Sequence, residues 1–214
     1  MCGETKPLVK AHIISKKFFE SLKQDKPYGV LVDSNKPIKS AGKFRQAGVY
    51  DNEILCECCE KKFSEFDRYG WEILGPITLD RPPAGRDLDV YKIDCETDNL
   101  RRFILSVLWR ASVSKNPFYS AVKLGPYETP IRERIINSDT LLPEEFPTLA
   151  MILETGALGK YDSVLFPPSH GRMQNGTIIH TLFPAPIHES CLRLAFLLKA
   201  RRSAGRWSSS DKPD

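Results

Sequence analysis

The sequence contains no long run of apolar residues, and none approaches the roughly 20 that a membrane-spanning helix needs. The segment from Met1 to Lys6 lacks the apolar stretch of a secretory signal, and no segment repeats another. These features exclude an integral membrane protein and argue against a secreted one. We therefore expect a cytoplasmic protein with no membrane partner.

A strong net charge is also lacking, since the formal value is only +4, but the charge is unevenly distributed. Between Lys10 and Arg45, nine basic residues accompany only three acidic ones. Such a stretch can contact a phosphate backbone, although a solvated loop in a mildly basic protein is the simpler alternative. The basic residues that we expect at a nucleic acid are Lys10, Lys16, Lys17, Lys43 and Arg45.

Cysteines are few, but three of the six lie within four positions of the chain. In a reducing compartment, such clustering indicates a metal site more than disulfides. The spacing of Cys56 and Cys59 places two sulfurs at one tight turn, which suits tetrahedral zinc, and Cys2 is the third candidate ligand. Cys58 is expected to point away, so the identity of the fourth ligand is undecided. It could be an upstream cysteine, Cys58 after a rearrangement or a histidine, or the fourth position could be empty. Thiols that pack as hydrophobes without a metal are the alternative.

Local patterns in the first half predict short, mixed elements. Apolar residues on both sides of His12 predict a strand, residues 16–22 a helix, and residues 29–32 a second strand. A further helix is expected to follow Cys59 and to stop at Gly70.

The second half is expected to be mainly helical. Asp98 is predicted to cap a helix that runs through Trp109, and Thr129 to cap another that ends at Ile136. Residues 146–153 are predicted as a third helix.

Strand composition near residues 161–166 and 177–183 predicts one small hairpin at about 161–183. Residues 187–198 fit a helix or a strand, and their good helix formers favour a helix. The polar residues 201–214 are expected to form a disordered tail.

Together these patterns predict an α+β protein of two domains. Residues 1–75 form the first, residues 76–94 a linker rich in proline and glycine, and residues 95–200 the mainly helical second domain.

Two segments, from Lys10 to Ser15 and from Tyr50 to Glu60, resemble the ββα-metal, or HNH, endonuclease motif. In that family a histidine stands at the end of a strand after a first zinc knuckle, and a second knuckle opens the helix that completes the metal site. The resemblance covers residues 1–70. It implies a treble-clef knuckle with a structural zinc ion, and a separate catalytic magnesium or manganese ion.

By position, the resemblance implies that His12 is the general base and that Asn52 is the central asparagine of the motif. Glu60 falls where the family commonly has a histidine ligand. Asp67 follows seven residues later, so the two carboxylates can share a helix face. We expect Glu60 and Asp67 to hold the catalytic ion, since magnesium keeps several waters and needs few carboxylates.

Two functions are consistent with these features. The first is a metal-dependent endonuclease that hydrolyses phosphodiester bonds of DNA, in which a base deprotonates water and a cation stabilises the developing charge. The second is a zinc-stabilised, catalytically inactive regulatory protein that binds nucleic acid or protein. Ala11 and Ser64 favour the second, because they stand where the family often carries ligands.

Residues 103–112 and 122–127 resemble a group of bacterial HNH-like proteins with a helical C-terminal region, which implies a bacterial or phage setting. Residues 95–200 would then contact the substrate, a protein partner or a second copy of the chain. Within that region, Trp109 and Arg110 are expected at the core and the rim of a helix.

Overall fold

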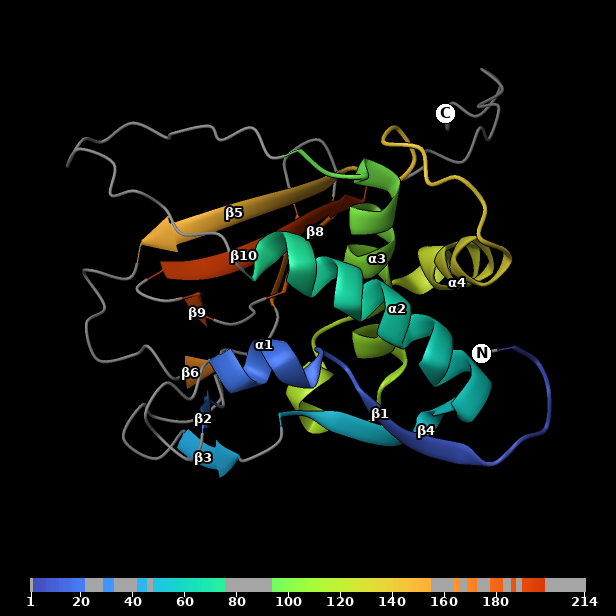
Figure 1. Cartoon of the computed structure of the whole chain (residues 1–214), viewed down its shortest axis with the longest axis horizontal. Coiled ribbons are helices and arrows are strands. Elements are labelled where there is room, and N and C mark those ends of the chain that lie inside the picture. The colour runs from blue at the N-terminus through green and yellow to red at the C-terminus, as the bar shows by residue number, and fades with distance from the viewer. Residues whose placement is uncertain are drawn as a thin grey trace, which may run out of the picture.

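The computed structural model describes residues 2–21, 29–32, 42–45, 48–75, 94–154, 164–165, 169–172, 178–182, 186–187 and 190–198. The helices are α1 (Lys16–Ser21), α2 (Glu57–Leu74), α3 (Thr97–Val113) and α4 (Glu128–Asn137), with 3-10 turns at Pro117–Tyr119 and Gly125–Tyr127. The strands are β1 (Leu8–His12), β2 (Gly29–Val32), β3 (Gly42–Arg45), β4 (Tyr50–Cys56), β5 (Thr148–Glu154), β6 (Val164–Leu165), β7 (Ser169–Arg172), β8 (Ile178–Leu182), β9 (Pro186–Ile187) and β10 (Ser190–Leu198). The chain is thus a mixed helix-and-strand protein (Figure 1).

The N-terminal part is a two-stranded hairpin followed by a helix. β1 pairs with β4 in antiparallel fashion, so that Leu8 lies opposite Cys56 and His12 opposite Tyr50. Ala11 and Leu55 on these strands are completely buried. α2 begins at Glu57, directly after β4. The strand around His12, the helix near residue 16 and the strand over 29–32 are therefore confirmed. The helix expected after Cys59 is present but begins earlier, at Glu57, and includes Cys58 and Cys59.

The predicted stop at Gly70 is wrong, because α2 continues to Leu74. Gly70 instead lies where α2 packs on α3: a Cβ atom there would come within 2.3 Å of the Phe103 ring. Only glycine allows this close approach between the two helices. The residue is therefore required by packing in the middle of the helix, and the helix ends one turn later.

α3 is the central helix of the fold. Every residue from Arg102 to Ser112 is buried, since α2 and α4 both pack against it. Its predicted cap is wrong: the helix begins one residue before Asp98, whose carboxylate instead accepts hydrogen bonds from Arg102 Nη2 (2.8 Å) and the Leu141 N–H (3.0 Å). α4 likewise begins at Glu128, so Thr129 lies in its first turn and is not its cap.

The C-terminal part contains a sheet where helices were expected. Residues 148–154 and 190–198 form β5 and β10, which pair in antiparallel fashion with Leu153 opposite Cys191. The sheet order is β5-β10-β8-β7, with β9 on β10. Cross-strand pairing along β10 overrides the helix propensity of its leucines and alanines, which is a weak preference of a few tenths of a kcal/mol per residue.

The predicted hairpin is also different in detail. β8 pairs with β7, while β6 belongs to a separate sheet of order β3-β2-β6 and pairs in parallel with β2. The prediction of a mostly helical second half is therefore wrong, although the α+β character of the chain holds. Residues 76–93 of the linker predicted over 76–94, and the tail predicted over 201–214, lie outside the described residues.

One hydrophobic core includes residues from before and after the predicted linker, among them Phe18, Phe63, Phe103 and Ile131. The Phe18 and Phe103 rings stack at 5.5 Å between centroids. In the part of the chain that the structure describes, no helix is both long enough and apolar enough to cross a membrane.

Candidate metal centre and neighbouring polar site

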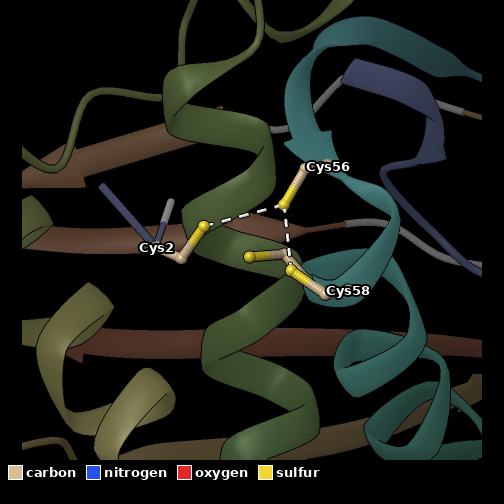
Figure 2. Close-up of side chains that lie close together, drawn as sticks. Cys2, Cys56 and Cys58 are labelled. Carbon is tan, nitrogen blue, oxygen red and sulfur yellow. Dashed lines mark hydrogen bonds between the residues drawn. The ribbon is translucent and has the colours of Figure 1, made fainter. Parts of the chain in front are cut away.

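A cluster of four cysteines lies where β4 ends and α2 begins. The sulfurs of Cys2, Cys56, Cys58 and Cys59 all lie within 4.8 Å of one another. The Cys2 and Cys56 sulfurs are 3.6 Å apart, and those of Cys56 and Cys58 are 3.2 Å apart (Figure 2). Four sulfurs at about 2.3 Å from one zinc ion in a tetrahedron are roughly 3.8 Å apart. The cluster can therefore hold a metal ion such as zinc.

Cys58 is part of this cluster, contrary to the expectation that it points away. α2 starts directly after Cys56, so Cys58 lies in the first turn of the helix and its sulfur faces that of Cys56 (Figure 2). Among the candidates for the fourth ligand, the described residues provide Cys58. Lys6 Nζ lies 3.9 Å from its sulfur, which places a positive charge beside the most exposed thiol of the four.

The thiols of the cluster differ in acidity. The pKa of Cys56 is lowered to about 6 by the Cys59 backbone N–H and by the thiols of Cys58, Cys59 and Cys2, against the opposing effect of burial. Burial and the neighbouring Cys56 raise the pKa of Cys59 to about 12. These shifts favour a thiolate at Cys56 and a protonated thiol at Cys59. A dication would favour further thiolates, so metal binding should release protons.

His12 is the last residue of β1, and its pairing with Tyr50 places it at the end of the hairpin away from Cys56, which lies opposite Leu8. Its half-buried ring meets the Tyr50 ring edge-on, at 6.1 Å between centroids. Lys10 Nζ lies 3.8 Å from the centre of the Tyr50 ring, which is 37% exposed. Asn52, two residues further along β4, is exposed. The predicted base and the predicted asparagine therefore come from adjacent strands.

Glu60 lies in the first turn of α2, next to His12. The His12 backbone N–H hydrogen-bonds its carboxylate, while the other oxygen, Oε2, is buried without a hydrogen-bond partner among the described residues. Burial, together with the charge of Asp67, raises the pKa of Glu60 against the opposing effect of Arg110. The Ser64 hydroxyl, one turn further along α2, donates to the Glu60 carbonyl oxygen at 2.9 Å.

Asp67 does not fit the predicted role of ion ligand. Its Oδ1 accepts from Arg110 Nη2 at 2.5 Å, and its Oδ2 accepts from Arg110 Nη1 at 2.9 Å. Asp67 does share a helix face with Glu60, as the spacing predicts, but the cation that it meets is a guanidinium. Arg110 itself is 0% exposed and belongs to the core, not to a rim. No local pattern predicts this pair, because its partners are 43 residues apart.

The predicted nucleic-acid contacts fall into two groups. Lys10, Lys16 and Lys17 are exposed on β1 and α1, with Lys16 in an ion pair with Glu20 at 3.0 Å. Lys43 and Arg45 both belong to β3, which pairs with β2.

Comparisons of the chain with protein-family models, with curated proteins and with solved structures give no match. Function is therefore inferred from the residues of the site.

Proposed function

We propose that this protein is an HNH-like, metal-dependent phosphodiesterase that acts on DNA. The observation that supports this most is the juxtaposition of His12 with Glu60. A histidine at the end of β1 and a carboxylate in the first turn of α2 are linked through the His12 N–H, and one carboxylate oxygen has no hydrogen-bond partner among the residues that the structure describes. A buried acceptor of this kind needs a proton, a water or a cation.

His12 would act as the general base, because the pKa of an imidazole lies near neutrality. Glu60 would hold the divalent ion, with Asn52 on the adjacent strand beside the substrate. A magnesium or manganese ion bound there would stabilise the charge that develops on the phosphate. Lys10 and Tyr50, on the exposed side of the hairpin, would contact the phosphate backbone and a base of the nucleic acid.

A second candidate is supported by a different observation. Asp67 is neutralised by Arg110, and Ala11 and Ser64 provide no ligands at the positions where the HNH family often has them. The same scaffold would then be a metal-stabilised protein that binds nucleic acid without cleaving it. In both candidates the cysteine cluster holds a structural zinc ion.

The two candidates are separated by incubating the protein with plasmid DNA, and with RNA, in the presence of magnesium or manganese. The nuclease proposal predicts metal-dependent cleavage of DNA that falls by at least about a hundredfold in His12→Ala and in Glu60→Gln. Glu57→Gln is the matched control, since Glu57 is an exposed acid of the same helical turn. It should leave cleavage unchanged.

Salt-dependent binding of DNA without cleavage would support the second candidate and overturn the first. Cleavage of equal rate in His12→Ala and in the wild type would also overturn the first, because it would indicate another active site or a contaminating nuclease. Absence of both cleavage and binding would contradict both candidates.

A further inference from the structure

Arg110 has more hydrogen-bonding partners than its pairing with Asp67 requires. Its Nη1 donates to the His12 carbonyl oxygen at 2.7 Å, besides the bond to Asp67. Its Nε and Nη2 lie 3.3 and 3.4 Å from the carbonyl and hydroxyl oxygens of Ser106. The side chain therefore connects α3, α2 and the end of β1 through one planar group.

These bonds hold the backbone of His12 from two helices. The His12 N–H is bonded to Glu60 on α2, and the His12 carbonyl is bonded to Arg110 on α3. The next residue, Ile13, donates its N–H to the Val49 carbonyl at 3.1 Å. The peptide units on both sides of His12 are thus fixed at the point where β1 ends, where a strand would otherwise fray.

Arginine suits this task better than lysine. A guanidinium can bond a carboxylate with two parallel N–H groups and still donate to a third acceptor, whereas an ammonium is a point charge on a flexible stem. Complete burial makes the pairing with Asp67 necessary, because an isolated buried charge is very costly. Asp67 thus fixes the guanidinium in the orientation that reaches His12.

We propose that Arg110 is a positioning residue for His12, and that Asp67 is its anchor. The role in catalysis depends on the function proposed above, while the effect on the backbone of β1 does not. α3, in the second half of the chain, would thus help to form a site that the resemblance to the HNH family places entirely within residues 1–70.

The test compares Arg110→Lys with Arg102→Lys. Arg102 is the matched control, since it is also buried in α3 and also bonds one carboxylate, that of Asp98, together with the carbonyl oxygens of Ser138 and Asp139. The two variants therefore lose comparable interactions, but only one of them touches His12. Amide hydrogen exchange of His12 and Ile13 is followed by NMR, and DNA cleavage is measured at varied substrate concentration.

We expect exchange at His12 and Ile13 to be at least about tenfold faster in Arg110→Lys than in Arg102→Lys, when both are measured at matched global stability. If the protein cleaves DNA, kcat should fall on the order of a hundredfold in Arg110→Lys, with KM changed less than about twofold, because the base is misplaced and substrate binding is not. Equal exchange rates in the two variants would overturn the proposal.

A wild-type protein without nuclease activity would overturn the proposed function alone, since the exchange measurement still judges the positioning of His12. If Arg110→Lys does not fold, Asp67→Asn takes its place, because it keeps the guanidinium and removes the charge that anchors it. Exchange at His12 and Ile13 that is no faster in Asp67→Asn than in Arg102→Lys would then overturn the proposal.

Discussion

Asp51 is a buried carboxylate that joins β4 to the residues that follow α3. It accepts hydrogen bonds from the Ser114 hydroxyl (2.7 Å), the Lys115 N–H (2.9 Å) and the Glu53 N–H (2.8 Å). Burial tends to raise the pKa of Asp51, but these hydrogen bonds outweigh it and lower the pKa below its ordinary value. The ionised form of Asp51 is therefore the one that stabilises the fold.

The stabilisation by Asp51 should depend on pH in a defined direction. Because the pKa is lower in the folded chain, the contribution is complete above the unfolded value of about 3.9 and is lost as the pH falls through the folded value. Asp51→Asn should lower the free energy of unfolding by about 1–2 kcal/mol at pH 7, and this difference should shrink below about pH 4. Urea denaturation from pH 7 to pH 2 measures it.

Asp139→Asn is the control for this measurement, because Asp139 is an exposed aspartate whose substitution should leave the stability at pH 7 nearly unchanged. A difference between Asp51→Asn and the wild type that grows as the pH falls would contradict the role given to Asp51.

At the level of single residues, the sequence predicts those sites whose signal is local. Cys56 and Cys59 are recognisable from their spacing, and the place of His12 in a strand is recognisable from its apolar neighbours. The Asp67–Arg110 pair is not, because it depends on how α2 and α3 pack. The predicted direction of Cys58 is wrong because the helix is expected only after Cys59, whereas α2 begins at Glu57 and places Cys58 in its first turn.

The junction of β4 with α2 is the element on which the candidate metal centre depends. Three of the four cysteines lie within its four residues, and the fourth, Cys2, comes from the segment before β1. A metal ion at this point would tie the start of the chain to the start of α2. Its effect should therefore be seen in the stability of the whole hairpin and helix.

Removal of the metal should destabilise the protein measurably. Zinc at about a hundred times its Kd stabilises the folded state by about 2.7 kcal/mol, which corresponds to a change in Tm of roughly 5–10 °C for a chain of this size. We expect a strong chelator to lower Tm by about that amount, and elemental analysis to find one zinc ion per chain. Cys56→Ser and Cys58→Ser should each weaken zinc binding.

Cys95→Ser serves as the control, since Cys95 is a cysteine outside the cluster and its substitution should leave the zinc content unchanged. Zinc-free protein with an unaltered Tm would refute the metal centre. Full zinc content in Cys58→Ser would refute Cys58 as the fourth ligand.

At the level of elements, helices with a clear apolar periodicity were predicted well and strands near the C-terminus poorly. α3 carries apolar residues at helical spacing over its whole length, and its existence follows from that pattern. β5 and β10 are mostly apolar, and a short apolar run does not distinguish a buried strand from a buried helix. These two segments become strands because they pair with each other, and this pairing joins residues that are far apart in the sequence.

At the level of the whole molecule, the hydrophobic core of the described residues combines side chains from before residue 76 with side chains from after residue 93. Phe63 and Gly70 on α2 face α3, and Asp67 is paired with Arg110 there. The predicted treble-clef segment therefore buries its helix against the second half of the chain. Zinc alone cannot replace this contact, because the apolar face of α2 would be exposed and Asp67 would lose its partner.

A fragment of residues 1–75 should therefore fail to fold cooperatively, even with zinc present. We expect it to show no sigmoidal thermal transition and little amide protection in α2, whereas the full chain shows both. Addition of a separate fragment of residues 94–214 should restore part of the protection, since it supplies α3. A fragment 1–75 that unfolds cooperatively on its own would contradict the shared core.

The parallel pairing of β2 with β6 also sets an order of events during synthesis. Val30 lies opposite Val164, so the sheet that begins with β2 and β3 is completed only after most of the chain has been made. At about 5–20 residues per second, the ribosome needs on the order of ten seconds to add the intervening residues. During that interval β2 has an open edge, which can pair with another nascent chain. The demand of this protein for chaperones should therefore fall on the growing polypeptide and not on the finished molecule.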